Sequence, residues 1–153
     1  MDRQQALLSY WFEGVDDALP LGRESLATKR WFGGGAALDT EINERFAADL
    51  VAADAGEYES WQETPAGALA LILLFDQVSR NVYRNKPEAF SFDARAQALT
   101  LRGLSEGVDE ALGLYERAFF YMPLMHSERL ELHDRAEASF SRLVALAGLR
   151  GLE

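Results

Sequence analysis

The sequence predicts an all-α protein, and its composition and apolar spacing are the two main observations behind that prediction. The 153 residues include 23 Ala and 23 Leu but only 6 Val, 2 Ile and 4 Thr. Alanine and leucine favour helices, whereas β-branched residues favour strands. Apolar residues also recur at steps of four in one segment, namely Leu38, Ile42, Phe46 and Leu50. We therefore expect a single helical domain over residues 1–153.

The most apolar stretch, residues 66–75, defines the centre of the expected fold. It is too short to span a membrane, which takes about 20 apolar residues, so we expect a buried central helix. Thr64 can cap the first turn, and Pro65 at the first helical position loses no hydrogen bond. This helix is expected over about residues 65–83.

Helix-start and helix-stop residues indicate where the other helices begin and end. Asp39, Asp93 and Ser127 are the predicted N-caps, and the glycines at 33–35 and Pro123 are predicted ends. About seven helices with short connections are expected, so neighbours should be antiparallel. Besides the central helix, the expected ranges are about 3–12, 24–32, 39–56, 93–106, 110–122 and 128–147.

One segment has the spacing of a helical repeat. Small, aromatic and proline residues stand at offsets of zero, four, seven and twelve, as in the second helix of a tetratricopeptide unit. An ordinary amphipathic helix ended by proline has the same pattern, and no second copy occurs, so both interpretations stay open. The residues concerned are Ala111, Tyr115, Ala118 and Pro123.

Charge and cysteine content exclude several classes of function. The net charge of −10 disfavours nucleic acid and anionic membranes as partners, because positive fields bind both. The absence of cysteine excludes disulfides and thiolate catalysis. The polar start of the chain, residues 1–5, lacks the apolar run of a signal peptide, so we expect a cytoplasmic location.

The charge is unevenly distributed along the chain. The net charge is −8 over residues 1–64, +2 over residues 65–105 and −4 over residues 106–153. An acidic protein therefore carries one cationic segment, which is densest at residues 80–86.

The first candidate site lies at the end of the predicted central helix. Asp76, Arg80 and Arg84 follow one another at steps of four, so they share a helix face. Two guanidiniums in a row can hold a phosphate or a carboxylate, with Asn81 as a neutral neighbour. A purely structural interpretation remains open, because Asp76 and Arg80 can form an ordinary helix ion pair and cations are favoured in a last helical turn.

The second candidate site surrounds an aromatic run. The pair Glu116-Arg117 precedes the run, and His126, Ser127 and Glu128 follow it. His126 is a candidate proton donor or acceptor, with Glu128 or Glu116 as a possible acid–base partner. Alternatively, His126 and Ser127 fix a turn through hydrogen bonds, and Glu128 complements a helix start.

Metal and nucleotide chemistry have little support in the sequence. His126 and His133 are two helical turns apart, with no ligand between them on that face. No phosphate-loop motif and no Gly-x-Ser-x-Gly motif occurs. We expect neither a metal nor a cofactor.

Residues 75–84 and 116–128 together resemble the two signature motifs of the bacterial family called domain of unknown function 924. Residues 10–12 and 30–32 resemble its N-terminal aromatic motifs, and the match covers about residues 6–145. The resemblance implies a tetratricopeptide-like array of antiparallel helices, but it implies no reaction. The family's polar motif positions fall on Asp76, Gln77, Arg80, Asn81, Arg84, Glu116, Arg117, His126, Ser127 and Glu128.

The chain departs from the family pattern at its C-terminus. Family members usually continue into a further segment with its own Arg, His and Asn motif, whereas this chain ends at Glu153. The segment is therefore expected to be absent here, either because the protein is a short variant or because the sequence is a truncated form. If that segment closes one wall of a pocket, we expect a site here to be half open.

Three functional hypotheses follow from the candidate sites. In the leading one, the domain is a binding module whose groove takes a peptide, a protein or an anionic small molecule. In the second, it is an enzyme in which His126 acts with Glu128 or Glu116 while Arg80 and Arg84 hold an anionic substrate. In the third, both motifs only specify the fold. The ligand-binding residues expected for the module are Asp76, Arg80, Asn81, Arg84 and Arg117.

Overall fold

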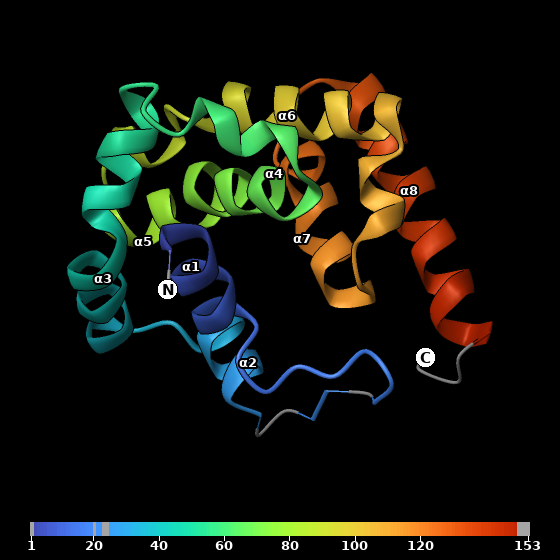
Figure 1. Cartoon of the computed structure of the whole chain (residues 1–153), viewed down its shortest axis with the longest axis horizontal. Coiled ribbons are helices and arrows are strands. Elements are labelled where there is room, and N and C mark those ends of the chain that lie inside the picture. The colour runs from blue at the N-terminus through green and yellow to red at the C-terminus, as the bar shows by residue number, and fades with distance from the viewer. Residues whose placement is uncertain (1, 20, 23–24, 150–153) are drawn as a thin grey trace.

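Every regular element that the structure describes is helical, which confirms the predicted all-α class (Figure 1). The structure is a computed structural model, and it describes residues 2–19, 21–22 and 25–149. The α-helices are α1 (Arg3–Trp11), α2 (Leu26–Thr28), α3 (Ala36–Asp54), α4 (Pro65–Ile72), α5 (Ser79–Val82), α6 (Asp93–Glu106), α7 (Leu114–Met125) and α8 (Leu130–Leu149). Two π-helical segments, η1 (Lys29–Gly33) and η3 (Leu73–Val78), and three 3₁₀ turns, η2 (Glu59–Glu63), η4 (Pro87–Phe90) and η5 (Val108–Ala111), complete the set.

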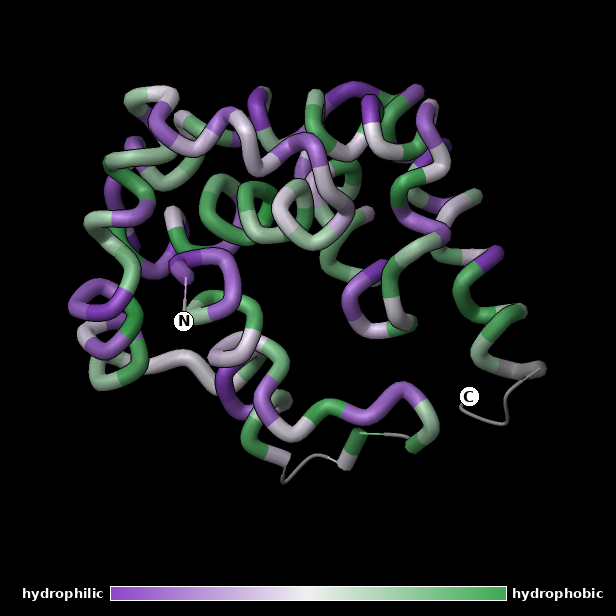
Figure 2. Tube along the Cα trace, viewed as in Figure 1, coloured by the Kyte–Doolittle hydropathy of each residue, from purple (hydrophilic) through white to green (hydrophobic). Residues whose placement is uncertain are grey.

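The predicted central helix is present as one continuous run of α4, η3 and α5, and it forms the core of the fold. Its first half is the most hydrophobic part of the chain and lies in the middle of the helices (Figure 2). Every residue from 67 to 76 is buried, against α1, α3, α6 and α7. Full burial of a leucine or isoleucine contributes about 1.5–3 kcal/mol, so this run anchors the other helices.

The start of α4 confirms the predicted cap. The Thr64 hydroxyl accepts a hydrogen bond from the Gly67 amide at 3.0 Å, and Pro65 is the first helical residue. A Cβ at Gly67 would come within 2.1 Å of the Trp61 carbonyl oxygen. Only glycine therefore allows η2 to pack this closely against α4.

The aromatic motifs of the first 32 residues contribute to packing. The Trp11 ring is 5.6 Å from Phe119 of α7, and the Trp31 ring is 4.8 Å from the same phenylalanine. The Trp31 indole also donates a hydrogen bond to the Trp11 carbonyl at 2.9 Å. These edge-to-face contacts join α1 and η1 to α7.

Two predicted N-caps are wrong. Gly35, with φ of 103°, precedes α3, and Asp39 lies inside the first turn of that helix. Phe92 precedes α6, and Asp93 is the first helical residue. Neither aspartate caps its helix, because both carboxylates bind arginines of the central run instead.

The second half of the chain also differs from the prediction. Pro123 does not close a helix but lies buried inside α7, which continues to Met125. The helix starts at Leu114 because residues 108–111 form a 3₁₀ turn. The apparent repeat spacing from Ala111 to Pro123 therefore spans two elements, and a tetratricopeptide-like array stays a prediction.

The last helix, α8, begins at Leu130, two residues later than predicted. The predicted N-cap Ser127 is therefore also wrong: its hydroxyl accepts a hydrogen bond from the Arg129 amide at 3.0 Å and fixes the turn that precedes the helix. Among the described helices, none is long and apolar enough to cross a membrane.

Candidate functional site

A buried carboxylate, that of Asp76, is the centre of the candidate site. Asp76 lies in the π-helical segment η3 and is 0% exposed. A π-helical turn is wider than an α-helical turn and is frequent at functional sites. A charged carboxylate at such a position needs hydrogen-bond donors around it, because burial without them is costly.

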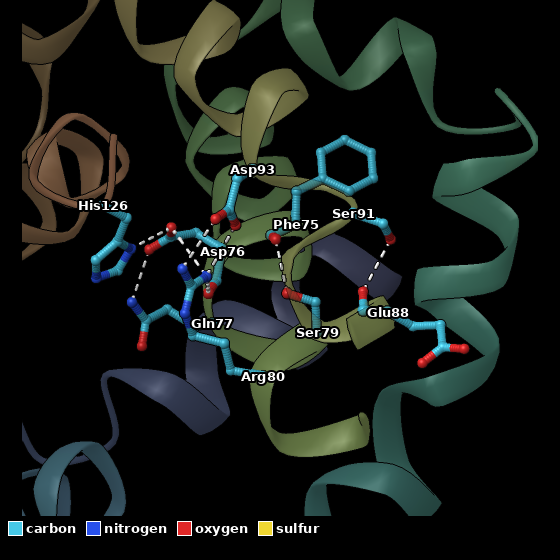
Figure 3. Close-up of polar contacts among 9 residues, drawn as sticks. All are labelled: Phe75, Asp76, Gln77, Ser79, Arg80, Glu88, Ser91, Asp93 and His126. Carbon is cyan, nitrogen blue, oxygen red and sulfur yellow. Dashed lines mark hydrogen bonds and ion pairs between the residues drawn. The ribbon is translucent and has the colours of Figure 1, made fainter. Parts of the chain in front are cut away.

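Three side chains supply those donors (Figure 3). The Nδ1 atom of His126 lies 2.7 Å from Asp76 Oδ1, and Gln77 donates to Oδ2 at 2.8 Å. Arg80 donates to Oδ1 at 3.3 Å and to the Asp76 carbonyl one helical turn back. The two sequence motifs therefore meet at one carboxylate, and His126 and Arg80 share the same oxygen atom.

Arg80 joins this carboxylate to a second one. Its Nη1 and Nη2 groups donate to the two carboxylate oxygens of Asp93 at 3.1 and 3.2 Å. Burial raises the pKa of Asp93, and the nearby Asp76 carboxylate adds to the rise, although Arg80 and His126 oppose it. We call Asp76, Gln77, Arg80, Asp93 and His126 the Asp76 network.

Arg84, one turn further along, binds a carboxylate from α3. Its Nε and Nη2 groups donate to Asp39 at 2.6 and 3.1 Å, and Asn81 donates to the same carboxylate at 2.9 Å. Burial by itself raises the pKa of Asp39, but the hydrogen bonds from Arg84 and Asn81 outweigh it, and the pKa is lowered.

A hollow beside the two arginines shares Arg80 with the Asp76 network. Its volume is about 480 Å³. Its lining contains three cations and no carboxylate, and the Arg80 guanidinium lies 5.4 Å from the ring of the exposed Phe90. We call it the Arg84 hollow, and its lining residues are Arg80, Arg84, Asn85, Lys86, Pro87, Ala89 and Phe90.

Donor groups in the Arg84 hollow remain available. Within the described part of the chain, Arg84 Nη1 makes no hydrogen bond and Lys86 forms no ion pair. The Arg84 side chain is 49% exposed. The hollow can therefore offer at least two cationic groups to a ligand.

Glu116 and Arg117 lie elsewhere. The Glu116 carboxylate accepts a hydrogen bond from the Gly113 amide at 2.9 Å and so stabilises the start of α7. It precedes His126 by ten residues, about 15 Å along a helix axis. Arg117 donates to the Tyr121 hydroxyl at 3.0 Å, and that hydroxyl donates to the buried Asp109. The structure therefore does not bring this pair to the Asp76 network.

The two residues after His126, Ser127 and Glu128, are not part of the Asp76 network either. Glu128 is exposed and forms no hydrogen bond or ion pair with the described residues, whereas the Ser127 carbonyl is hydrogen-bonded to His133. His126 and His133 thus have different partners. Among the described residues, no group of three or more His, Asp and Glu side chains could hold a metal ion.

The sequence does not predict three of the contacts in these clusters. The sequence predicts Asp39 and Asp93 as helix caps, whereas they bind Arg84 and Arg80, and no local pattern pairs Asp76 with His126. The partners are 45, 13 and 50 residues apart in the chain, so no local spacing links them. The one available signal was that acidic residues are rare in the cationic segment, which contains only Asp76, Glu88 and Asp93.

The fold and these contacts define a small all-helical protein with a buried polar network between the end of its central helix and the end of α7 (Figure 3). The chain belongs to the DUF924 family, described as a bacterial protein of unknown function, whose model matches residues 7–149. A solved structure from Agrobacterium tumefaciens, of the protein of unknown function ATU0120, is similar, with a TM-score of 0.74 and 28% identity. The similarity covers 87% of this chain and 69% of that one. A comparison with curated proteins gave no match.

Proposed function

We propose that this domain is a binding module that takes a carboxylate or phosphate group of a peptide or small molecule in the Arg84 hollow. The single observation that carries the proposal is the lining, which combines Arg80, Arg84 and Lys86 with no carboxylate in a chain of net charge −10. A volume of about 480 Å³ lies within the range of small-molecule sites, about 300–1,000 Å³.

Arg80 and Arg84 have different roles in the hollow, because their contacts with the protein differ. Arg80 is only 24% exposed and is held by two carboxylates, so it forms a fixed wall. Arg84 is held on one edge by Asp39 and keeps its Nη1 group free within the described structure. A guanidinium fixed on one edge loses little side-chain entropy when its other edge binds an anion. The exposed Phe90 offers an apolar surface beside that anion.

Isothermal titration calorimetry with phenyl phosphate and with a capped tetraglutamate peptide tests the proposal. We expect binding by the wild-type chain, about tenfold weaker binding by Arg84→Gln and by Lys86→Gln, and weakening of all binding by salt. Arg129→Gln is the matched control, because it removes the same charge from an exposed arginine paired with Glu131. Equal affinities in all four proteins, or no binding to the wild type, would contradict the proposal.

An enzyme is the second candidate, and one contact favours it. His126 directs Nδ1 at a buried carboxylate, which favours the tautomer with the proton on Nδ1 and leaves Nε2 as an acceptor. The His126 side chain is 29% exposed. Asp76, rather than Glu128 or Glu116, is then the residue that orients His126, and Arg80 and Arg84 hold the anionic substrate.

An activity assay of the His126→Gln variant distinguishes the enzyme from the binding module. If the domain is an enzyme, turnover of phosphate monoesters or carboxylate esters should fall by at least 10²-fold while calorimetric binding of phenyl phosphate stays within about twofold. No wild-type turnover on either substrate class would remove this candidate and leave the binding module.

A further inference from the structure

A second cavity lies on another face of the central helix, away from the Arg84 hollow. It is bounded by the end of α3, by η2, by the central run and by α6, and its volume is about 280 Å³. No residue lines both spaces. Its chemistry is therefore independent of the proposed function.

The floor of this cavity is apolar. Leu71 and Phe75 of the central run are 3% and 5% exposed, and Leu99 of α6 is half-buried beside them. Tyr58 forms another side, and its ring stacks on Trp61 with ring centroids 4.0 Å apart. An apolar floor with an aromatic wall binds a compact hydrocarbon group.

Two arginines of α6 stand at the rim. Arg95 and Arg102 are seven residues apart, so they lie on one helix face about 10 Å apart along the axis. The Arg95 guanidinium lies over the Phe75 ring at 4.7 Å and donates to Asp54 at 2.6 Å, which fixes its position. The Asp54 carboxylate that pairs with Arg95 also lines the cavity, whereas Glu106, which pairs with Arg102, does not.

Arg102 is the arginine at the rim that keeps an unused hydrogen-bond donor. Its Nε group forms an exposed ion pair with Glu106 at 3.2 Å, and its Nη1 group donates to the side-chain amide oxygen of Gln62 at 2.8 Å. Its Nη2 group makes no hydrogen bond to a described residue. Glu59, the remaining rim carboxylate, is exposed and forms no ion pair within the described chain.

We infer that this cavity binds a small carboxylic acid with an apolar body, whose carboxylate pairs with Arg102 and whose body rests on Leu71, Phe75 and Leu99. The free Nη2 group can donate a charge-assisted hydrogen bond to the carboxylate, which is stronger than a bond between neutral groups. The volume of 280 Å³ limits the body to about the size of a phenyl ring with a short chain, so an extended peptide does not fit.

Two-dimensional ¹H–¹⁵N NMR with 3-phenylpropionate and its neutral analogue 3-phenylpropan-1-ol tests the inference. The Trp61 indole N–H reports on the cavity through its stacking on Tyr58, and Trp61→Phe assigns its signal. We expect the carboxylate to shift this signal with a Kd of about 1 mM and the alcohol to bind about tenfold more weakly.

Two variants locate the site. Arg102→Gln should abolish the difference between acid and alcohol, whereas Arg129→Gln should preserve it. Ala98→Phe adds a ring at an exposed lining position, so it should block both ligands without disturbing the core.

The inference is overturned if acid and alcohol bind the wild type equally, if neither shifts the indole signal, or if Ala98→Phe folds and binds both as before. Phenyl phosphate binding at the Arg84 hollow should be unaffected by Ala98→Phe, so the two proposals fail separately.

Discussion

Arg80 and Arg84 are one helical turn apart, and each binds an aspartate through two nitrogen atoms, yet the two pairs differ in burial and in charge balance. Arg80 is 24% exposed and lies between Asp76 and Asp93. Arg84 is 49% exposed and binds Asp39 alone. The pKa of Asp93 is raised by burial, whereas hydrogen bonds lower the pKa of Asp39.

The difference shows that the same pair of residue types can serve two purposes within one motif. Around Arg80 two carboxylates compete for one guanidinium inside the protein, so this pair organises the core and His126. Around Arg84 one carboxylate fixes one edge of the guanidinium and leaves the other edge toward the hollow. The deeper arginine is structural, and the outer one is suited to bind a ligand.

The largest expected effect comes from removing the shared carboxylate. Asp76→Ala leaves Arg80 and His126 without their common partner in the protein interior, so we expect a loss of about 3–5 kcal/mol in the free energy of unfolding. Asp39→Ala should cost about 1 kcal/mol, because its partner remains accessible to water. Urea unfolding followed by circular dichroism measures both. Equal losses would refute the division between the two arginines.

Arg84→Ala should have a smaller effect on stability, about 0–1 kcal/mol in the free energy of unfolding, because its ion pair is half-exposed. Anion affinity should fall about tenfold in the same variant. Arg80→Lys is the comparison, since lysine cannot form two parallel bonds to Asp93 and should lower the melting temperature more. A larger loss of stability in Arg84→Ala than in Arg80→Lys would reverse the assignment of roles.

The sequence predicted the scaffold well because the central helix carries strong local signals. The apolar run and the Thr64-Pro65 start are sufficient to place α4, and they do so within a residue. The π-helical segment that follows was not predicted, and the buried carboxylate that it carries, that of Asp76, is bound by a residue 50 positions away. Intrinsic helix propensity is a local property of the sequence, so it does not predict such long-range contacts.

The part of the candidate site that depends on local helical spacing was also predictable from the sequence. The helical spacing of Asp76, Arg80 and Arg84 placed them on one face, and their local ion pair is present. The cap prediction failed at Asp39 and Asp93, because a tertiary arginine offered each carboxylate a charged donor in place of a backbone amide. Proximity in sequence also wrongly suggested that Glu116 and His126 act together, although they lie at opposite ends of α7.

The two aspartates should respond to acid in opposite directions. The lowered pKa of Asp39 gives stability that is present above its ordinary value of 3.8 and is lost as the pH falls through the folded value. For Asp93 the pKa is raised, so its contribution is greatest below 3.8 and is lost as the pH rises through the folded value. Unfolding free energies between pH 2.5 and 7 should therefore fall less on acidification in Asp39→Asn and more in Asp93→Asn, by roughly a few tenths of a kcal/mol. Parallel profiles for the two variants would contradict the opposite shifts.

The last expected effect is a gain of binding. Asp39 competes with a ligand for the Arg84 guanidinium, and Asp39→Asn keeps the shape of the side chain while it removes the competing charge. The affinity for phenyl phosphate should rise about threefold, a change of about 0.7 kcal/mol, and more at low ionic strength. The matched control is Asp54→Asn, which removes a carboxylate bound to Arg95 outside the Arg84 hollow and should leave the affinity unchanged. A fall in affinity in Asp39→Asn would show that Asp39 positions Arg84 more than it competes for it, and the outer arginine would then depend on its aspartate as much as the inner one does.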